Sequence, residues 1–115
     1  MIREFKEKRQ KGNERIFAEK HLGINRFFAL DGAAYKGGAL EPKIKELMGL
    51  AASLVLRCDD CVLYHIERSV EEGASRDELN ETLNIGLIVG GSIVIPHLRR
   101  AYTAIDAAFA EKESK

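Results

Sequence analysis

The chain has only two cysteines, Cys58 and Cys61, and His65 follows the second one. Residues three and four apart share one face of a helix, so these three side chains are predicted to line one stripe. A thiol must lose its proton before it attacks, and both the amino end of a helix and a neighbouring imidazole favour that loss. The pattern is typical of a dithiol/disulfide redox centre.

The composition predicts one domain over residues 1–115 and a cytoplasmic location. The 18 basic and 18 acidic residues balance, so nothing indicates nucleic acid or an anionic membrane as a partner. The charged amino terminus lacks the apolar core of a signal peptide, and the apolar stretch 85–96 is far shorter than the roughly 20 residues of a membrane helix. In the cytoplasm a close cysteine pair is more often catalytic or metal-binding than structural.

The elements that must position these residues are predicted to be helices, about six in an all-α fold. A first helix over 2–20 has a possible break at Gly12–Asn13, and Asn25 is predicted to cap the second. The remaining helices are expected over 42–57, 59–73 and 75–89, with a last one ending near Ala110. Ile93–Ile95 has strand propensity, but no partner strand is evident, so we do not predict a sheet.

Two side chains are candidates to assist the thiols. His65 lies one turn after Cys61, which predicts a contact along the helix and a role as the base. Glu46 lies in the apolar third helix, where a carboxylate is costly unless it has a partner; an exposed glutamate stabilised by the helix dipole is equally compatible. Tyr64 and Asp60 flank the site, His97 is expected to be structural, and His21 is expected on the surface.

Other interpretations of the cysteine pair remain open. In one interpretation, both cysteines are small buried side chains. In another, they bind zinc together with His65 and either His97 or Glu46, although a second closely spaced ligand pair is missing. Haem attachment would need histidine directly after Cys61, and a thioredoxin scaffold would need strands. Small residues in the most apolar helices, and a high apolar content, predict contact with another copy of the chain.

Glu46, then eleven residues, then Cys58-x-x-Cys61-x-x-x-His65 resembles the AhpD-like branch of the carboxymuconolactone decarboxylase family. Lys45–Leu47, Glu72–Ser75 and the glycine-bearing segment Leu83–Ser92 are also similar, and the resemblance covers roughly residues 40–105, after N-terminal helices over 1–36.

The resemblance implies an all-helical trimer or hexamer with its active site close to subunit contacts. It implies a proton relay of Glu46, His65 and Cys61, with Cys58 as the more accessible sulfur. The implied substrate is a hydroperoxide or a disulfide, or the pair passes electrons to a partner peroxidase; the implied reductant is a dihydrolipoamide-type dithiol. No metal, flavin or nucleotide cofactor is implied.

One position departs from the family pattern. Asp60 stands where well-studied alkylhydroperoxidases carry a histidine, and its negative charge is expected to disfavour the neighbouring thiolate. Decarboxylase members proper lack the cysteine pair, which favours a thiol oxidoreductase with peroxidase activity and an antioxidant role. A decarboxylase-like lyase and a non-redox zinc-binding module remain the alternatives.

Overall fold

Six α-helices make up the fold of residues 2–114, which are the residues that the computed structural model describes. They are α1 (Ile2–Ala18), α2 (Leu22–Ala34), α3 (Pro42–Val55), α4 (Asp59–Glu71), α5 (Arg76–Gly90) and α6 (Ile95–Glu113). A short 3₁₀ turn, Ser92–Val94, joins α5 to α6. The described part of the chain contains no strand, so the all-α prediction is confirmed and Ile93–Ile95 continues into a helix instead.

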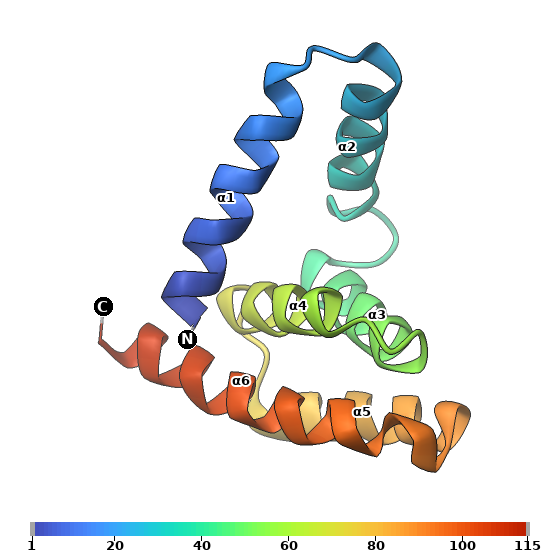
Figure 1. Cartoon of the computed structure of the whole chain (residues 1–115). Helices are drawn as coiled ribbons and strands as arrows, with labels where there is room; N and C mark the ends of the chain where they lie inside the picture. The colour runs from blue at the N-terminus through green and yellow to red at the C-terminus, as the bar shows by residue number, and fades with distance from the viewer. Residues whose placement is uncertain (1, 115) are drawn as a thin grey trace.

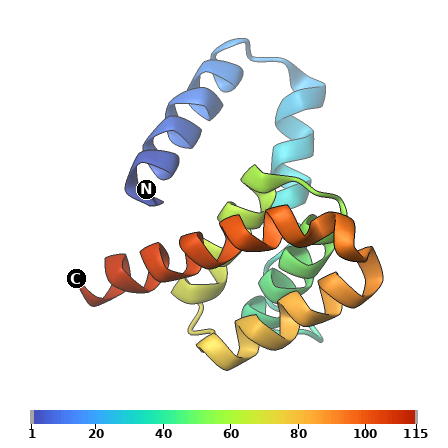
Figure 2. The ribbon, with the colours of Figure 1, turned by 60° about the horizontal axis from the view of Figure 1, so that its bottom comes forward.

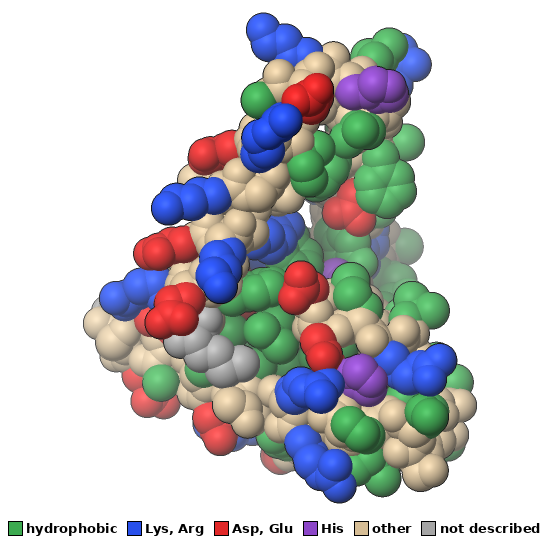
Figure 3. Space-filling view, viewed as in Figure 1, with side chains coloured by type: hydrophobic (Ala, Val, Ile, Leu, Met, Phe, Trp, Pro, Cys, Tyr) green, Lys and Arg blue, Asp and Glu red, His purple; other side chains and the backbone are tan. Residues whose placement is uncertain are grey.

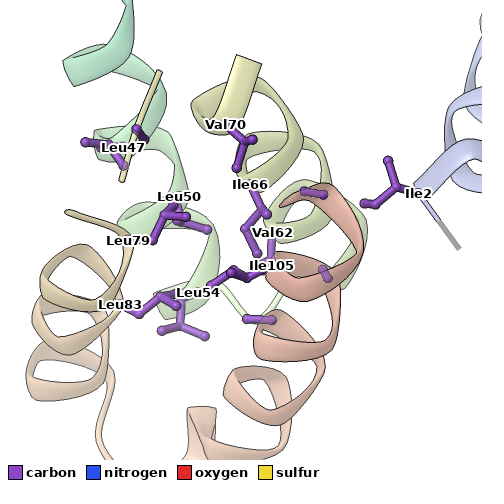
Figure 4. Packing of buried hydrophobic residues seen from close by; sticks show 14 of the residues in the cluster. Ile2, Leu47, Leu50, Leu54, Val62, Ile66, Val70, Leu79, Leu83 and Ile105 are labelled. Carbon is purple, nitrogen blue, oxygen red and sulfur yellow. The ribbon is translucent and has the colours of Figure 1, made fainter. Parts of the chain in front are cut away.

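The last four helices form the body of the molecule. Helix α3 packs against α4 and α5, and α4 packs against α6, so the four helices surround one core (Figures 1 and 2). Their apolar side chains recur three or four residues apart, as a helix with one buried face requires. Figure 4 shows that these side chains meet between the four helices. The fully buried apolar members from the body are Leu50, Leu54, Val62, Ile66, Val70, Leu79, Leu83, Val94, Ala101, Ala104 and Ile105.

Helices α1 and α2 form an arm that rises from this body (Figure 1). Only the start of α1 is anchored: Ile2 is buried in the core, Arg3 pairs with Glu111 at 3.2 Å, and Lys6 lies 3.5 Å from the Glu67 carboxylate. At the far end of the arm, Phe17 packs edge-on against Phe28 with 4.9 Å between the ring centres. The start of α1 therefore holds the arm to the body, and at the far end of the arm α1 and α2 pack against each other.

Helix α2 is apolar yet has no fully buried residue among its thirteen, all of which are described. Figure 3 shows apolar side chains gathered along α2, whereas the visible face of α1 carries interspersed charges. The most exposed large apolar side chains of α2 are Leu22, Phe27 and Leu30, with 61, 67 and 71 % of their surface accessible. A face of this kind is typical of a surface that another molecule covers.

Two local predictions about the arm are wrong. Helix α1 runs through Gly12 without a break, because one glycine costs a helix only about 1 kcal/mol and the flanking residues are good helix formers. Helix α2 begins one turn before Asn25, with His21 as its N-cap: the His21 Nδ1 accepts the Ile24 N–H at 3.3 Å. The turn after α1 ends at Lys20, which has a left-handed φ of 54°, and the next residue, His21, therefore takes the N-cap position of α2.

The predicted capping box of α5 is confirmed. The Ser75 hydroxyl accepts the Glu78 N–H at 3.1 Å, and the Glu78 carboxylate accepts the Ser75 N–H at 2.9 Å. Gly73, at φ 91°, makes the turn that precedes it. None of the described helices is long and apolar enough to cross a membrane.

We expect Ser75→Ala to lower the free energy of unfolding by about 1 kcal/mol, because it removes one half of the capping box. Urea denaturation followed by circular dichroism measures this change. Ser92→Ala is the matched control, since the exposed Ser92 side chain makes no hydrogen bond to any described residue. Equal losses in the two variants would show that the box does not stabilise α5.

Candidate active site

The two cysteines lie at the junction of α3 and α4, which a particular turn creates. Helix α3 ends in a Schellman motif: the Cys58 N–H donates to the Ser53 carbonyl at 3.1 Å and the Arg57 N–H to the Leu54 carbonyl at 3.0 Å. Arg57 takes the left-handed conformation, φ 59°, that this motif requires and that glycine usually supplies. The turn makes Cys58 both the last residue of that motif and the N-cap of α4.

Both thiols face the amino end of α4. The Cys58 sulfur accepts the backbone N–H of Cys61 at 3.3 Å, as an N-cap side chain does, and both cysteines are free thiols. The prediction that Cys58, Cys61 and His65 share one helical stripe is thus wrong for Cys58, which precedes the helix. The implication that Cys58 is the more accessible sulfur is also wrong, because Cys61 is exposed and Cys58 is partly buried.

Glu46 and His65 form a buried pair between α3 and α4. Only 2 % of Glu46 and 8 % of His65 is accessible, and Glu46 Oε1 lies 2.9 Å from His65 Nδ1. The second carboxylate oxygen lies 3.8 Å from Nε of Arg68. The sequence is compatible with a Glu46 that is either buried with a partner or exposed, and the structure shows it buried with His65 as its partner. A carboxylate can only accept, so Nδ1 carries the proton of a neutral imidazole and Nε2 is left as the acceptor.

Tyr35 contacts that free nitrogen. Its hydroxyl lies 3.4 Å from His65 Nε2, and the two rings are 5.3 Å apart at an interplanar angle of 36°. Burial, with smaller contributions from Asp31 and Glu46, raises the pKa of Tyr35, so its hydroxyl is protonated at neutral pH. The sequence analysis did not identify Tyr35, because it stands far from the motif and has no spacing relation to it.

Cys61 and His65 open into the same cavity, of about 510 Å³, between α4 and the arm. Among residues 2–114 no hydrogen bond joins the Cys61 sulfur to His65, and both side chains line this cavity. The Arg9 guanidinium lies 4.0 Å above the Tyr64 ring and connects the arm to α4 at this point. The other lining residues are Phe5, Lys8, Gly12, Asn13, Ile16, Asp31 and Asp60.

The surroundings of Cys61 raise the pKa of its thiol and so keep it protonated. Its hydrogen bond with the Cys58 side chain is the largest cause, and burial is the next; with the charges of Cys58, Asp60 and Asp31 they raise the pKa of Cys61 to about 11. The effect of Asp60 has the expected direction, but the neighbouring sulfur matters more. At neutral pH Cys61 is therefore a thiol, and a base has to remove its proton before it can attack.

Asp59, the other carboxylate between the cysteines, is held by α6. Its two oxygens lie 2.7 Å from His97 Nδ1 and 2.7 Å from an Arg100 guanidinium nitrogen. His97 therefore ties the start of α4 to α6, the structural role expected of it. No group of three or more His, Cys, Asp or Glu side chains within residues 2–114 is arranged to hold a metal ion.

Comparisons with known proteins agree on one family. The sequence model of the carboxymuconolactone decarboxylase family matches residues 24–104. An uncharacterised protein of Cupriavidus necator is 35 % identical over 75 residues, which are 65 % of this chain and 66 % of that protein.

Solved structures of family members superpose on the whole fold. A crystal structure of a Thermotoga maritima protein has a TM-score of 0.92 at 51 % identity and covers 96 % of this chain and 94 % of its own. That protein is described as a member of the carboxymuconolactone decarboxylase family with a suggested involvement in the antioxidative response. A family member from Legionella pneumophila, without ligand, has a TM-score of 0.85 at 27 % identity, covering 93 and 96 % of the two chains.

We expect Cys58→Ala to accelerate the alkylation of Cys61 by iodoacetamide at pH 8 about tenfold. Without the Cys58 sulfur the pKa of Cys61 falls from about 11 toward its ordinary value, so more thiolate is present, although each thiolate is a weaker nucleophile. Peptide mapping of the reduced protein across a pH series measures the rate at Cys61 alone. Asp60→Asn is the control and should accelerate alkylation less; an unchanged rate in Cys58→Ala would contradict the assignment.

Proposed function

We propose that this chain, which belongs to the carboxymuconolactone decarboxylase family, is a thiol-dependent peroxidase or disulfide oxidoreductase of the AhpD-like branch, with an antioxidant role. The observation that supports this best is that His65, bound by the buried Glu46 carboxylate, lines the same cavity as the exposed Cys61, whose N–H donates to the Cys58 sulfur. The description of the Thermotoga maritima relative points the same way. One domain over residues 1–115 and a cytoplasmic location stay predictions.

In the proposed mechanism Glu46 orients His65, and His65 takes the proton of Cys61. The Cys61 thiolate attacks one oxygen of a hydroperoxide and the O–O bond breaks; the leaving alkoxide takes the proton from the imidazolium, which gives an alcohol and a sulfenic acid at Cys61. Cys58 then attacks that sulfur, water leaves, and a Cys58–Cys61 disulfide forms. A disulfide substrate would follow the same sequence through a mixed disulfide.

The raised pKa of Cys61 explains why such a mechanism needs a base. A thiol whose pKa is about 11 supplies almost no thiolate at neutral pH, so proton removal has to accompany substrate binding. The cavity lies between the arm and α4, and the exposed Cys61 is part of its lining, so a substrate that enters the cavity can reach Cys61. A dihydrolipoamide-type dithiol would then reduce the disulfide to two thiols and become oxidised itself; where a partner peroxidase is the electron acceptor, the Cys58–Cys61 dithiol reduces that partner and forms the same disulfide.

Cys61→Ser and Cys58→Ser should each abolish hydroperoxide consumption in the presence of dihydrolipoamide, because each removes one sulfur of the disulfide. His65→Gln should lower the rate by roughly 100-fold or more, since it removes the base. Loss of hydroperoxide measured against time checks all three, with Tyr102→Phe as a control whose hydroxyl bonds only to Asn80, at 2.8 Å.

Two further measurements, of lactone turnover and of bound zinc, can contradict the proposed function. Turnover of a carboxylated lactone that persists in both serine variants would identify a decarboxylase. Stoichiometric zinc in the purified protein, with no dithiol-dependent turnover, would identify a metal-binding module.

We also propose that the chain forms a homo-oligomer, a trimer or a hexamer, in which the arm contacts another copy. The exposed apolar face of α2 supports this, because such a large exposed apolar surface is unusual on an isolated soluble chain. Other exposed apolar side chains, on α3 and α5, offer a surface that it can meet: Met48, Leu56, Ile85, Ile88 and Val89.

A double change of Phe27 and Leu30 to Glu should convert the oligomer to a monomer, because it places two charges in the apolar face of α2. Size-exclusion chromatography with light scattering measures the mass in solution. Lys11→Glu, a change of similar charge on the exposed surface of α1, should leave the mass unchanged. A wild-type chain that is already monomeric would refute the proposal.

A further inference from the structure

The backbone that carries Tyr35 is held in place by a side chain of α3. The Lys45 ammonium donates to the Ala34 carbonyl at 2.9 Å and to the Lys36 carbonyl at 2.8 Å, so it binds the residues on either side of Tyr35. These carbonyls lie at the carboxyl end of α2, where a positive charge is favourable. Lys45 thus fixes the backbone of Tyr35, which contacts one side of His65. The next residue in the chain, Glu46, binds the other side of His65.

Gly49, one turn further along α3, leaves the space in which Tyr35 and His65 meet. A Cβ atom at this position would lie 2.8 Å from the Tyr35 hydroxyl and 2.7 Å from Cε1 of His65, closer than packing allows. Three residues of α3 therefore act on one imidazole: Glu46 binds its Nδ1, Lys45 fixes the residue that contacts its Nε2, and Gly49 makes room for that contact.

A tyrosine hydroxyl suits both protonation states of the imidazole. While Nε2 is unprotonated it accepts the hydrogen bond, and the hydroxyl is the donor. After Nε2 has taken a proton, the same oxygen accepts, because a hydroxyl can turn about its C–O bond and offers both a proton and lone pairs. The contact at 3.4 Å is long, as hydrogen bonds of a site without substrate often are.

We propose that Tyr35, whose flanking backbone is held by Lys45, is a positioning residue for His65: its hydroxyl keeps Nε2 at the cavity wall and in one tautomer, ready to take the proton of Cys61. The role of His65 as base rests on the proposed function, whereas the hold of Tyr35 on His65 does not. Tyr35 itself forms no bond to substrate in this proposal. Because Nε2 has a single lone pair, the Tyr35 hydroxyl turns its own proton away from Nε2 as the proton of Cys61 passes to that nitrogen.

Tyr64 shows why the hydroxyl rather than the ring carries this role. Its ring also contacts His65, with 5.1 Å between the ring centres and a T-shaped arrangement. Its hydroxyl makes no hydrogen bond to His65 or to any other residue in the range 2–114. Tyr35→Phe and Tyr64→Phe therefore each remove one oxygen beside the same imidazole, and only the first removes a bond to it.

The test that does not depend on activity is ¹⁵N NMR of histidine-labelled protein, with His65 assigned through His65→Gln. In wild-type protein above the titration of the imidazole, we expect Nε2 of His65 to resonate as a hydrogen-bonded acceptor. In Tyr35→Phe and in Lys45→Met its signal should move toward that of a free acceptor nitrogen or of a tautomer mixture. Tyr64→Phe should leave it in place, and an unchanged signal in Tyr35→Phe would overturn the proposal.

The second measurement is hydroperoxide turnover across a pH series. Loss of one hydrogen bond worth about 1 to 1.5 kcal/mol predicts a kcat five- to tenfold lower in Tyr35→Phe, an unchanged KM and an altered pH profile. In a His65→Gln background Tyr35→Phe should have no further effect, because Tyr35 acts through His65. A shifted NMR signal with wild-type turnover, or equal losses in both backgrounds, would overturn the positioning role.

The two measurements separate failure of this proposal from failure of the proposed function. If the wild-type protein consumes no hydroperoxide, the proposed function is wrong, and the NMR comparison alone decides whether Tyr35 holds His65. Thermal unfolding of each variant shows whether a lost signal reflects an altered fold rather than a lost hydrogen bond.

Discussion

The hydrogen bond between Glu46 and His65 is the contact on which the site depends. A carboxylate with 2 % of its surface accessible is costly to bury unless a donor meets it, and His65 Nδ1 does so at 2.9 Å. The bond fixes the register of α3 against α4, since only one pairing of the two helices brings these residues together. It also determines which imidazole nitrogen is free, and thus where a proton from Cys61 can go.

The two cysteines depend on a second constraint, the turn between the same two helices. Because Arg57 adopts a left-handed conformation, α3 ends before it, α4 starts at Asp59 and Cys58 becomes the cap of α4. Both cysteines then lie at one helix amino end, where the Cys61 N–H donates to the Cys58 sulfur, and the Cys58 side chain is the largest cause of the raised pKa of Cys61. In the proposed mechanism, a dithiol held in this way stays protonated at rest and reacts only when a base and a substrate are both present.

Much of this arrangement could be predicted from the sequence, because its signals are local. Ser75 and Glu78 form the expected capping box, α4 begins at the expected junction, Asp59, and Cys61 and His65 lie one turn apart on it. The predictions that were wrong have physical reasons. Asn25 is a better cap than His21 by propensity, but the position of the cap depends on where Lys20 ends the preceding turn.

Other features depend on contacts between distant segments, which spacing along the chain does not reveal. The burial of Glu46 depends on α4, and the contact of Tyr35 with His65 spans thirty residues. The exposure of Cys61 relative to Cys58 follows from the Schellman turn, whose left-handed residue is an arginine rather than the usual glycine. The only sequence signal near Tyr35 is its place before Lys36-Gly37-Gly38, which indicates a turn but no partner.

The central claim is that Cys58 and Cys61 act as one redox unit, and intact-mass spectrometry tests it most directly. Fully reduced protein treated with one equivalent of hydroperoxide should lose two hydrogen atoms, and peptide mapping should place the new disulfide between Cys58 and Cys61. A stable oxygen adduct on Cys61 with Cys58 still open to alkylation, or an unchanged mass, would contradict the account.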